Sequence, residues 1–163
     1  MPKIDAIVRE MLREGETTKK VLGRVPSDKL DWKPHPRSRS IGDLAWHLAA
    51  LPARIAAMAS HEEADVMVVR QPPLPDSTGA IVAAFTAGLE SAREALSKLS
   101  DEDLEKKFLF RRGDVTMAHL PKHAFLRTVL LNHSYHHRGQ LAVYLRLLGV
   151  PVPPIYGPTA DEA

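Results

Sequence analysis

The chain has 163 residues, of which 44% are hydrophobic and 26% are charged, and its formal net charge is +2. This composition is typical of one globular domain and excludes a largely disordered chain. There is no cysteine, which excludes disulfide bonds, a thiolate nucleophile and zinc sites with cysteine ligands. The basic residues are scattered among acidic ones, so we expect no nucleic-acid partner.

Targeting and membrane signals are also missing from the sequence. The first residues, Met1 to Asp5, lack the apolar core of a signal peptide. No run of about 18 apolar residues, the length that spans a bilayer, occurs anywhere in the sequence. Together with the lack of cysteine, these features predict a cytoplasmic protein without a membrane partner.

The first half of the chain predicts two helices joined by a loop. Apolar residues recur at helical spacing from Ile4 to Gly23, which predicts the first helix. Several prolines over residues 26–39 predict a loop, and Trp32 within it is expected to dock on the helices. The second helix is expected to begin at Ser40, because Ser40 and Asp43 form a sequence close to a capping box.

The second half predicts two further helices and a hairpin. Residues 61–75 contain three prolines and are expected to be irregular. A bundle helix follows from about Asp76 to Leu99. Residues 107–117, with a central Gly-Asp pair, resemble a short β-hairpin. The last helix is predicted from about Leu120 to Leu148, and the chain as a whole is predicted to be all-α, a four-helix bundle.

Three histidines lie on predicted inward faces of these helices. His133 and His137 are four residues apart, so they point the same way, about 40° apart around the helix axis. One helix can offer two imidazoles to one metal ion in this way. His47 lies on the apolar face of the second helix, between Leu44 and Leu51. Helix packing can bring the three rings together inside the bundle, where bundle metal sites are built.

This arrangement favours a metal site with an open coordination position. Neutral imidazole binds zinc, nickel, copper and iron well. Three protein ligands leave at least one position for water or substrate, which is typical of catalytic sites. The alternative is that the histidines are ordinary core residues, each hydrogen-bonded to a neighbour.

Two segments carry a resemblance to a known family. Residues 133–141 read His-Ser-Tyr-His-His-Arg-Gly-Gln-Leu and contain a His-x-x-x-His-Arg-Gly-Gln pattern, and residues 41–48 surround His47. In both segments, and in the tail over residues 153–161, the chain resembles the DinB/YfiT-like superfamily of metal-dependent four-helix-bundle proteins. The resemblance implies one DinB-like domain over residues 1–163. It also implies an up-down-down-up arrangement with a long second crossover.

The resemblance also implies a function. Its ligand positions correspond to His47, His133 and His137, with nickel or zinc as the expected divalent metal and iron or manganese still open. It implies a homodimer that acts on a small-molecule substrate, with a low-molecular-weight thiol as cosubstrate in some relatives. A metal of this kind can activate a thiol or water, as in a thiol S-transferase or a hydrolase.

Two points stay open at this stage. No carboxylate can be placed as a general base, so a non-catalytic, stress-related metal-binding module is the alternative function. Arg138 and Gln140 either support the ligands or pack the helix, and Arg138 can equally form a surface ion pair or contact substrate.

Overall fold

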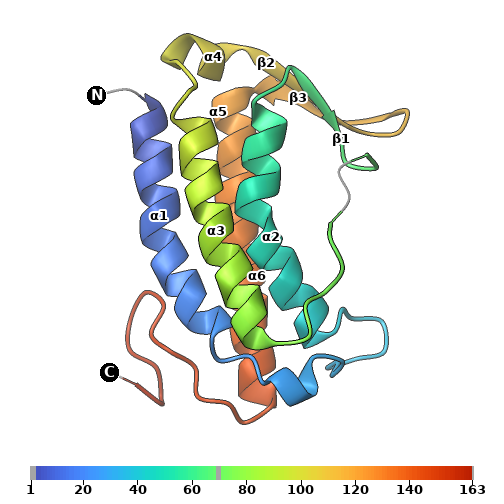
Figure 1. Cartoon of the computed structure of the whole chain (residues 1–163), viewed down its shortest axis with the longest axis vertical. Coiled ribbons are helices and arrows are strands. Elements are labelled where there is room, and N and C mark those ends of the chain that lie inside the picture. The colour runs from blue at the N-terminus through green and yellow to red at the C-terminus, as the bar shows by residue number, and fades with distance from the viewer. Residues whose placement is uncertain (1–2, 69–70, 163) are drawn as a thin grey trace.

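The computed structural model describes residues 3–68 and 71–162, and four long helices form a bundle in it (Figure 1). These are α1 (Lys3–Leu22), α2 (Ile41–Ala59), α3 (Thr78–Leu96) and α6 (His133–Leu147). In Figure 1, α1 and α6 run in one direction and α2 and α3 run in the other, which confirms the predicted up-down-down-up bundle. A long connection between α2 and α3 returns the chain to the other end of the bundle, so that these two helices run parallel.

A small sheet covers one end of the bundle (Figure 1). Its strands are β1 (Glu63–Asp65), β2 (Lys107–Arg112) and β3 (Val115–Pro121), in the order β1-β2-β3. β2 and β3 pair antiparallel and confirm the predicted hairpin, with Gly113 at a φ of +57° in its turn. β1 pairs parallel to β2 within the segment predicted to be irregular, so that prediction was wrong for these three residues.

Serine side chains cap the N-termini of three of the helices. Ser40 accepts a hydrogen bond from the Asp43 amide at 3.0 Å, as the sequence predicts for α2. Ser77 caps α3 in the same way. Ser100 and Asp103 form a complete capping box at α4 (Asp101–Glu105), a short helix that the sequence analysis did not predict.

The segment predicted as one last helix is built in three parts. α5 (Lys122–Phe125) begins directly after β3, and α6 ends before Gly149, whose φ is +70°. Between α5 and α6 lies the π-helical segment η2 (Leu126–Asn132). A π-helix has wider turns than an α-helix, so η2 changes the direction in which the following side chains point.

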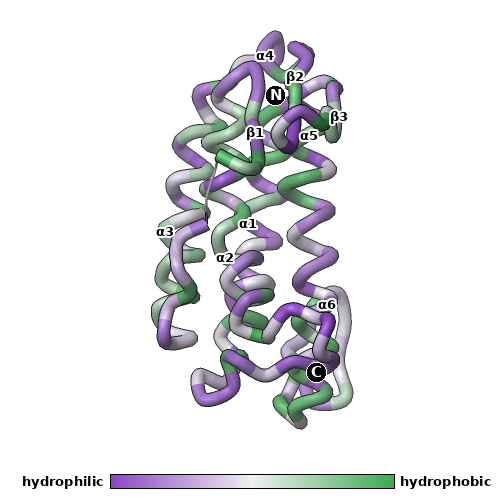
Figure 2. Tube along the Cα trace, turned by 90° about the vertical axis from the view of Figure 1, so that its right-hand side faces the viewer, coloured by the Kyte–Doolittle hydropathy of each residue, from purple (hydrophilic) through white to green (hydrophobic). Residues whose placement is uncertain are grey.

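The helices bury one continuous apolar core. Along the tube in Figure 2, hydrophobic and hydrophilic residues alternate, as expected for amphipathic helices. Trp32 packs edge-on against Tyr144 of α6, with ring centroids 5.8 Å apart, so the loop before α2 docks as predicted. Among the described residues, no helix has both the length and the apolar character that crossing a membrane requires.

Two glycines inside helices provide a matched test of this packing. A Cβ at Gly42 in α2 would lie 2.8 Å from the backbone oxygen of Leu30, whereas a Cβ at Gly139 in α6 would meet no atom within 4 Å. We expect Gly42→Ala to lower the free energy of unfolding by about 1–3 kcal/mol, because backbone must move. Gly139→Ala should raise it by up to about 1 kcal/mol through higher helix propensity. Urea denaturation measures both, and equal effects would contradict this packing.

Candidate metal centre

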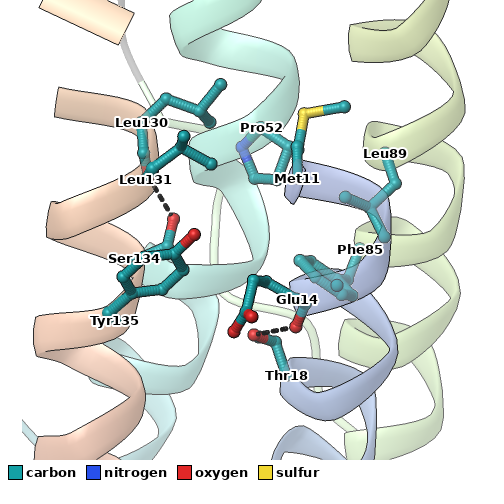
Figure 3. Close-up of a pocket in the computed structure, with 11 residues that line it drawn as sticks. Met11, Glu14, Thr18, Pro52, Phe85, Leu89, Leu130, Leu131, Ser134 and Tyr135 are labelled. Carbon is teal, nitrogen blue, oxygen red and sulfur yellow. Dashed lines mark hydrogen bonds between the residues drawn. The ribbon is translucent and has the colours of Figure 1, made fainter. Parts of the chain in front are cut away.

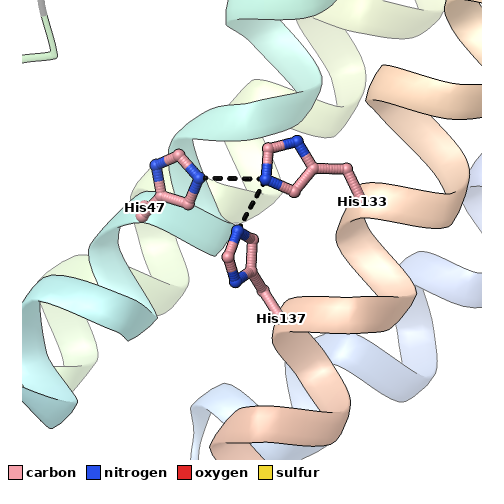
Figure 4. Close-up of side chains that lie close together, drawn as sticks. All are labelled: His47, His133 and His137. Carbon is pink, nitrogen blue, oxygen red and sulfur yellow. Dashed lines mark hydrogen bonds between the residues drawn. The ribbon is translucent and has the colours of Figure 1, made fainter. Parts of the chain in front are cut away.

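The three histidines predicted from the sequence lie together between α2 and α6. His47 projects from α2, and His133 and His137 project from the first two turns of α6 (Figure 4). The distance from His47 Nε2 to His133 Nε2 is 3.5 Å, and from His133 Nε2 to His137 Nε2 it is 2.6 Å. One ligand atom from each ring lies within 4.8 Å of the other two, so the three residues can hold a metal ion.

The spacing of these nitrogens agrees with the size of a first-row metal ion. Metal–nitrogen bonds of about 2.0–2.1 Å and bond angles near 90–110° place imidazole nitrogens about 2.9–3.4 Å apart. The two separations involving His133, 3.5 and 2.6 Å, lie on either side of this range. Shifts of a few tenths of an ångström would bring both into it.

Gln140 sets the tautomer of His137. His137 Nδ1 lies 2.7 Å from Gln140 Oε1, one turn further along α6. The amide oxygen can only accept, so Nδ1 carries the proton and the Nε2 lone pair is free to bind a metal. The glutamine of the His-Arg-Gly-Gln pattern therefore contacts one of the predicted ligands, in line with the first of the two roles left open above.

A second glutamine, which the sequence analysis did not single out, supports His47. The Gln71 side chain lies near His47 and acts to raise its pKa, and Arg54 Nη1 donates to Gln71 Oε1 at 3.5 Å. Trp46 Nε1 donates to the Pro72 oxygen at 2.7 Å and holds this part of the chain against α2. No sequence signal placed Gln71 here, because it lies in the long irregular connection.

The histidines are kept neutral by their surroundings. Burial, and to a smaller extent neighbouring imidazoles and Arg39, lower the pKa of His47 and of His133 to about 4. The pKa of His137 is also lowered, mainly by burial, although its bond to Gln140 acts in the opposite direction. Neutral rings have free lone pairs, so protons do not compete with a metal at neutral pH.

Arg138, next to His137, points away from the histidine cluster and into the protein. Only 1% of its surface is exposed, so it is neither a surface ion pair nor a substrate contact. Its Nη2 donates to Glu14 Oε2 at 2.8 Å and to the Tyr156 hydroxyl at 2.5 Å, and its Nη1 donates to the Glu14 carbonyl oxygen at 3.0 Å. Arg138 thus joins α6 to α1 and to the C-terminal segment.

A cavity found inside the described part of the bundle is too small for a substrate. A cavity of about 20 Å³ lies between α1, α2, α3 and the η2–α6 segment, and Figure 3 shows the side chains around it. Ligand pockets usually have volumes of about 300–1,000 Å³. The three histidines do not line this cavity, and their partial exposure leaves them accessible from the solvent side.

The hydrogen bond from His137 to Gln140 leads to a first prediction about the centre. Gln140→Leu removes the acceptor that fixes the Nδ1–H tautomer, and metal affinity should fall about tenfold or more. Calorimetric titration of the metal-free protein with zinc measures this affinity. His136→Gln is the matched control on the same helix, because His136 is exposed and its side chain is not a proposed ligand. Equal losses in both variants would assign no special role to Gln140.

The low histidine pKa values lead to a prediction about metal-free protein. In the unfolded chain these histidines titrate near their ordinary value of 6.5, but in the folded chain His47 and His133 titrate near 4. Between these values the unfolded state binds more protons, so the free energy of unfolding should fall as pH falls below about 6.5. Urea denaturation with chelator at pH values from about 7 to about 5 measures this slope. A His47→Gln/His133→Gln variant with an unchanged slope would contradict the prediction.

Comparison with known proteins agrees with the fold. The protein named Uncharacterized protein YrdA from Bacillus subtilis (strain 168) is 25% identical over 161 residues, which cover 98% of this chain and 91% of that protein. The crystal structure of a DinB-like protein from Bacillus cereus ATCC 10987 has a TM-score of 0.74 at 26% identity, covering 93% of this chain and 97% of that chain. A DinB-like protein from Bacillus subtilis, YjoA, shares the fold with a TM-score of 0.73 at 21% identity, covering 92% and 97%.

A family model gives the same result over the full length. The model described as the DinB family matches residues 1–163, and the segments around all three histidines lie within the match. The resemblance inferred from the two histidine motifs is thereby confirmed, and the chain belongs to the DinB family.

Proposed function

We propose that the protein is a metal-dependent enzyme that acts on small molecules, with His47, His133 and His137 as ligands of nickel or zinc. The observation that carries this proposal is the convergence of three imidazole nitrogens from two helices within 4.8 Å of one another. Three neutral nitrogen ligands suit both metals, and iron or manganese stay open. A bound divalent ion with an open position supplies a Lewis acid that lowers the pKa of a thiol or of water, as a thiol S-transferase or a hydrolase requires.

The residues around the histidines have supporting roles in this proposal. Gln140 and Gln71 orient His137 and His47. The partial burial of the rings keeps them unprotonated at neutral pH. The cosubstrate, a low-molecular-weight thiol, and its electrophile would approach from the solvent side. Action as a homodimer in the cytoplasm stays a prediction.

One observation favours a second candidate, a metal-binding module without catalysis. No described carboxylate is among the groups that shift the pKa of the three histidines most, so a general base is not evident beside the site. A transferase that uses a metal-activated thiolate needs no such base, whereas a hydrolase would benefit from one. The thiol reaction is therefore the more sensitive test of catalysis.

The test combines metal content with turnover. Protein purified without a histidine tag should hold about one equivalent of nickel or zinc by elemental analysis, and His133→Ala and His137→Ala should lose it. Metal-loaded protein should accelerate the reaction of mercaptoethanol with monobromobimane, followed by fluorescence, and His137→Ala should fall to the uncatalysed rate.

Three outcomes separate the candidates. Metal without turnover for any thiol would favour the non-catalytic module. No metal after incubation with nickel and zinc would contradict both candidates. Activity retained in a metal-free His137→Ala protein would contradict a metal-dependent mechanism.

A further inference from the structure

The C-terminal segment contacts the residue that follows a proposed metal ligand. Arg138 is the next residue after His137 on α6. Tyr156, in the C-terminal segment, accepts a hydrogen bond from Arg138 Nη2 at 2.5 Å and donates one to Glu14 Oε2 at 2.8 Å. One hydroxyl from outside the helices therefore touches both members of the ion pair that joins α6 to α1.

The ring of Tyr156 also covers the guanidinium of Arg138. The Arg138 Cζ atom lies 5.0 Å from the centroid of this ring and 5.3 Å from that of Tyr135, so two aromatic rings flank the charge. Tyr156 is 73% exposed, whereas Arg138 is 1% exposed, so the tyrosine is part of what separates the guanidinium from solvent. An ion pair from which water is excluded is stronger than the same pair in water.

Other contacts hold the segment around Tyr156 in place. Asp161 accepts hydrogen bonds from Arg146 Nη1 at 3.1 Å and from the Val152 amide at 2.9 Å. Thr159 Oγ1 donates to the Val152 carbonyl oxygen at 2.8 Å. These bonds close a loop around Tyr156 and tie it to the last turn of α6. Because the loop is already ordered, holding the Tyr156 ring in one position costs little additional conformational entropy.

The orientation of α6 about its axis decides whether its two histidines can share a metal ion with His47. A rotation of α6 that moved Arg138 away from Glu14 would carry both motif histidines with it, since they belong to the same helix. The Nε2 atoms of His133 and His137 lie 2.6 Å apart, and all three ligand atoms lie within 4.8 Å of one another. Metal–ligand distances tolerate deviations of only about 0.2 Å, so a small rotation weakens binding.

We propose that Tyr156 is a positioning residue of the metal centre, which acts through Arg138 to hold α6 at the rotation in which its two histidines face α2. This inference rests on the proposed function, because it assumes that the histidines bind a metal ion. The hydroxyl and ring of Tyr156 contact Arg138 and Glu14 rather than a ligand. The C-terminal segment is thereby part of the site, although the ligands lie on α2 and α6.

Two substitutions of Tyr156 separate the hydroxyl from the ring. Tyr156→Phe keeps the ring and loses both hydrogen bonds, whereas Tyr156→Ala also removes the cover over the guanidinium. Zinc affinity, measured by competition with a chromophoric chelator, should fall about threefold in Tyr156→Phe and about tenfold or more in Tyr156→Ala. Cobalt-loaded protein gives a spectroscopic readout, because the visible absorption of cobalt depends on the arrangement of its ligands. These bands should change in the same order.

Thr78→Val is the matched control for the loss of one hydroxyl. Thr78 Oγ1 donates to the Val25 carbonyl oxygen at 2.6 Å and joins α3, which carries none of the three histidines, to the connection after α1. Thr78→Val and Tyr156→Phe should lower the urea midpoint of unfolding by similar amounts. Thr78→Val should leave zinc affinity and the cobalt spectrum unchanged, which separates positioning from a general loss of stability.

A double-mutant cycle tests whether Tyr156 acts through Arg138. Arg138→Lys keeps a positive charge beside Glu14 but lacks the planar group that bonds several acceptors at once. In the Arg138→Lys background, Tyr156→Phe should therefore have little further effect on zinc affinity, whereas independent effects would add. Circular dichroism verifies that each variant is folded. If Arg138→Lys does not fold, the comparison of the Tyr156 variants with Thr78→Val decides the proposal.

The outcomes distinguish this inference from the proposed function. Zinc bound with equal affinity by the unaltered protein and both Tyr156 variants would overturn the positioning role and leave the metal centre intact. Equal losses of affinity in Tyr156→Phe and Thr78→Val, or additive losses in the cycle, would overturn it as well. No zinc or cobalt bound by the unaltered protein would overturn both proposals. The graded loss in the Tyr156 variants, absent in Thr78→Val, would establish the positioning role.

Discussion

Burying a guanidinium is costly unless its charge is paired and its N–H groups are hydrogen-bonded. Arg138 has almost no exposed surface, and both conditions are met where it contacts α1 and the C-terminal segment. Glu14 supplies the charge and a backbone acceptor, and the Tyr156 hydroxyl bridges the two by donating to Glu14 and accepting from Arg138. Burial raises the pKa of Glu14, but the bonds from Arg138 and Tyr156 lower it more, so the carboxylate stays charged. Rotation of α6 about its axis would break these hydrogen bonds and leave the buried charge of Arg138 unpaired. The network therefore fixes the direction in which His133 and His137 point.

Helix α6, which carries the His-x-x-x-His-Arg-Gly-Gln pattern, consequently has two faces that point into the protein. One holds the two histidines toward α2. The other is a stripe at spacings of three and four residues that runs from η2 into α6, in which Ser134 is half-buried and the following are buried: Leu131, Arg138, Leu141 and Leu145. A regular α-helix presents a single apolar face to a bundle, and a helix with two is hydrophobic over more of its circumference. The π-helical segment η2 immediately precedes His133, and such segments occur often at functional sites because they re-aim the residues that follow. We infer that η2 lets the leucines before the motif stay in the core while the histidines turn toward α2.

Much of this could be predicted from the sequence, for physical reasons that differ between elements. Apolar periodicity located the four long helices, and the i, i+4 spacing of His133 and His137 required them to share a face. What escaped prediction depends on contacts between distant parts of the chain. β1 exists only because β2 lies beside it, and Gln71 meets His47 only because the long connection folds back along α2. The spacing of Arg138 from Leu141 and Leu145 places it on their buried stripe. A charged residue is nevertheless expected to be solvent-exposed, and only the contact with Glu14 explains why Arg138 is buried.

The two supporting glutamines belong to parts of the chain with very different constraints. Gln140 lies on α6 itself, so its contact with His137 is set by helix geometry and by the same network that fixes the helix. Gln71 lies on a connection that the Trp46–Pro72 hydrogen bond ties to α2, and it also contacts Arg54. Because hydrogen bonds to a ligating histidine tune its strength as a metal donor, the proposed centre would depend on the packing of the long connection through His47 and on the geometry of α6 through His137.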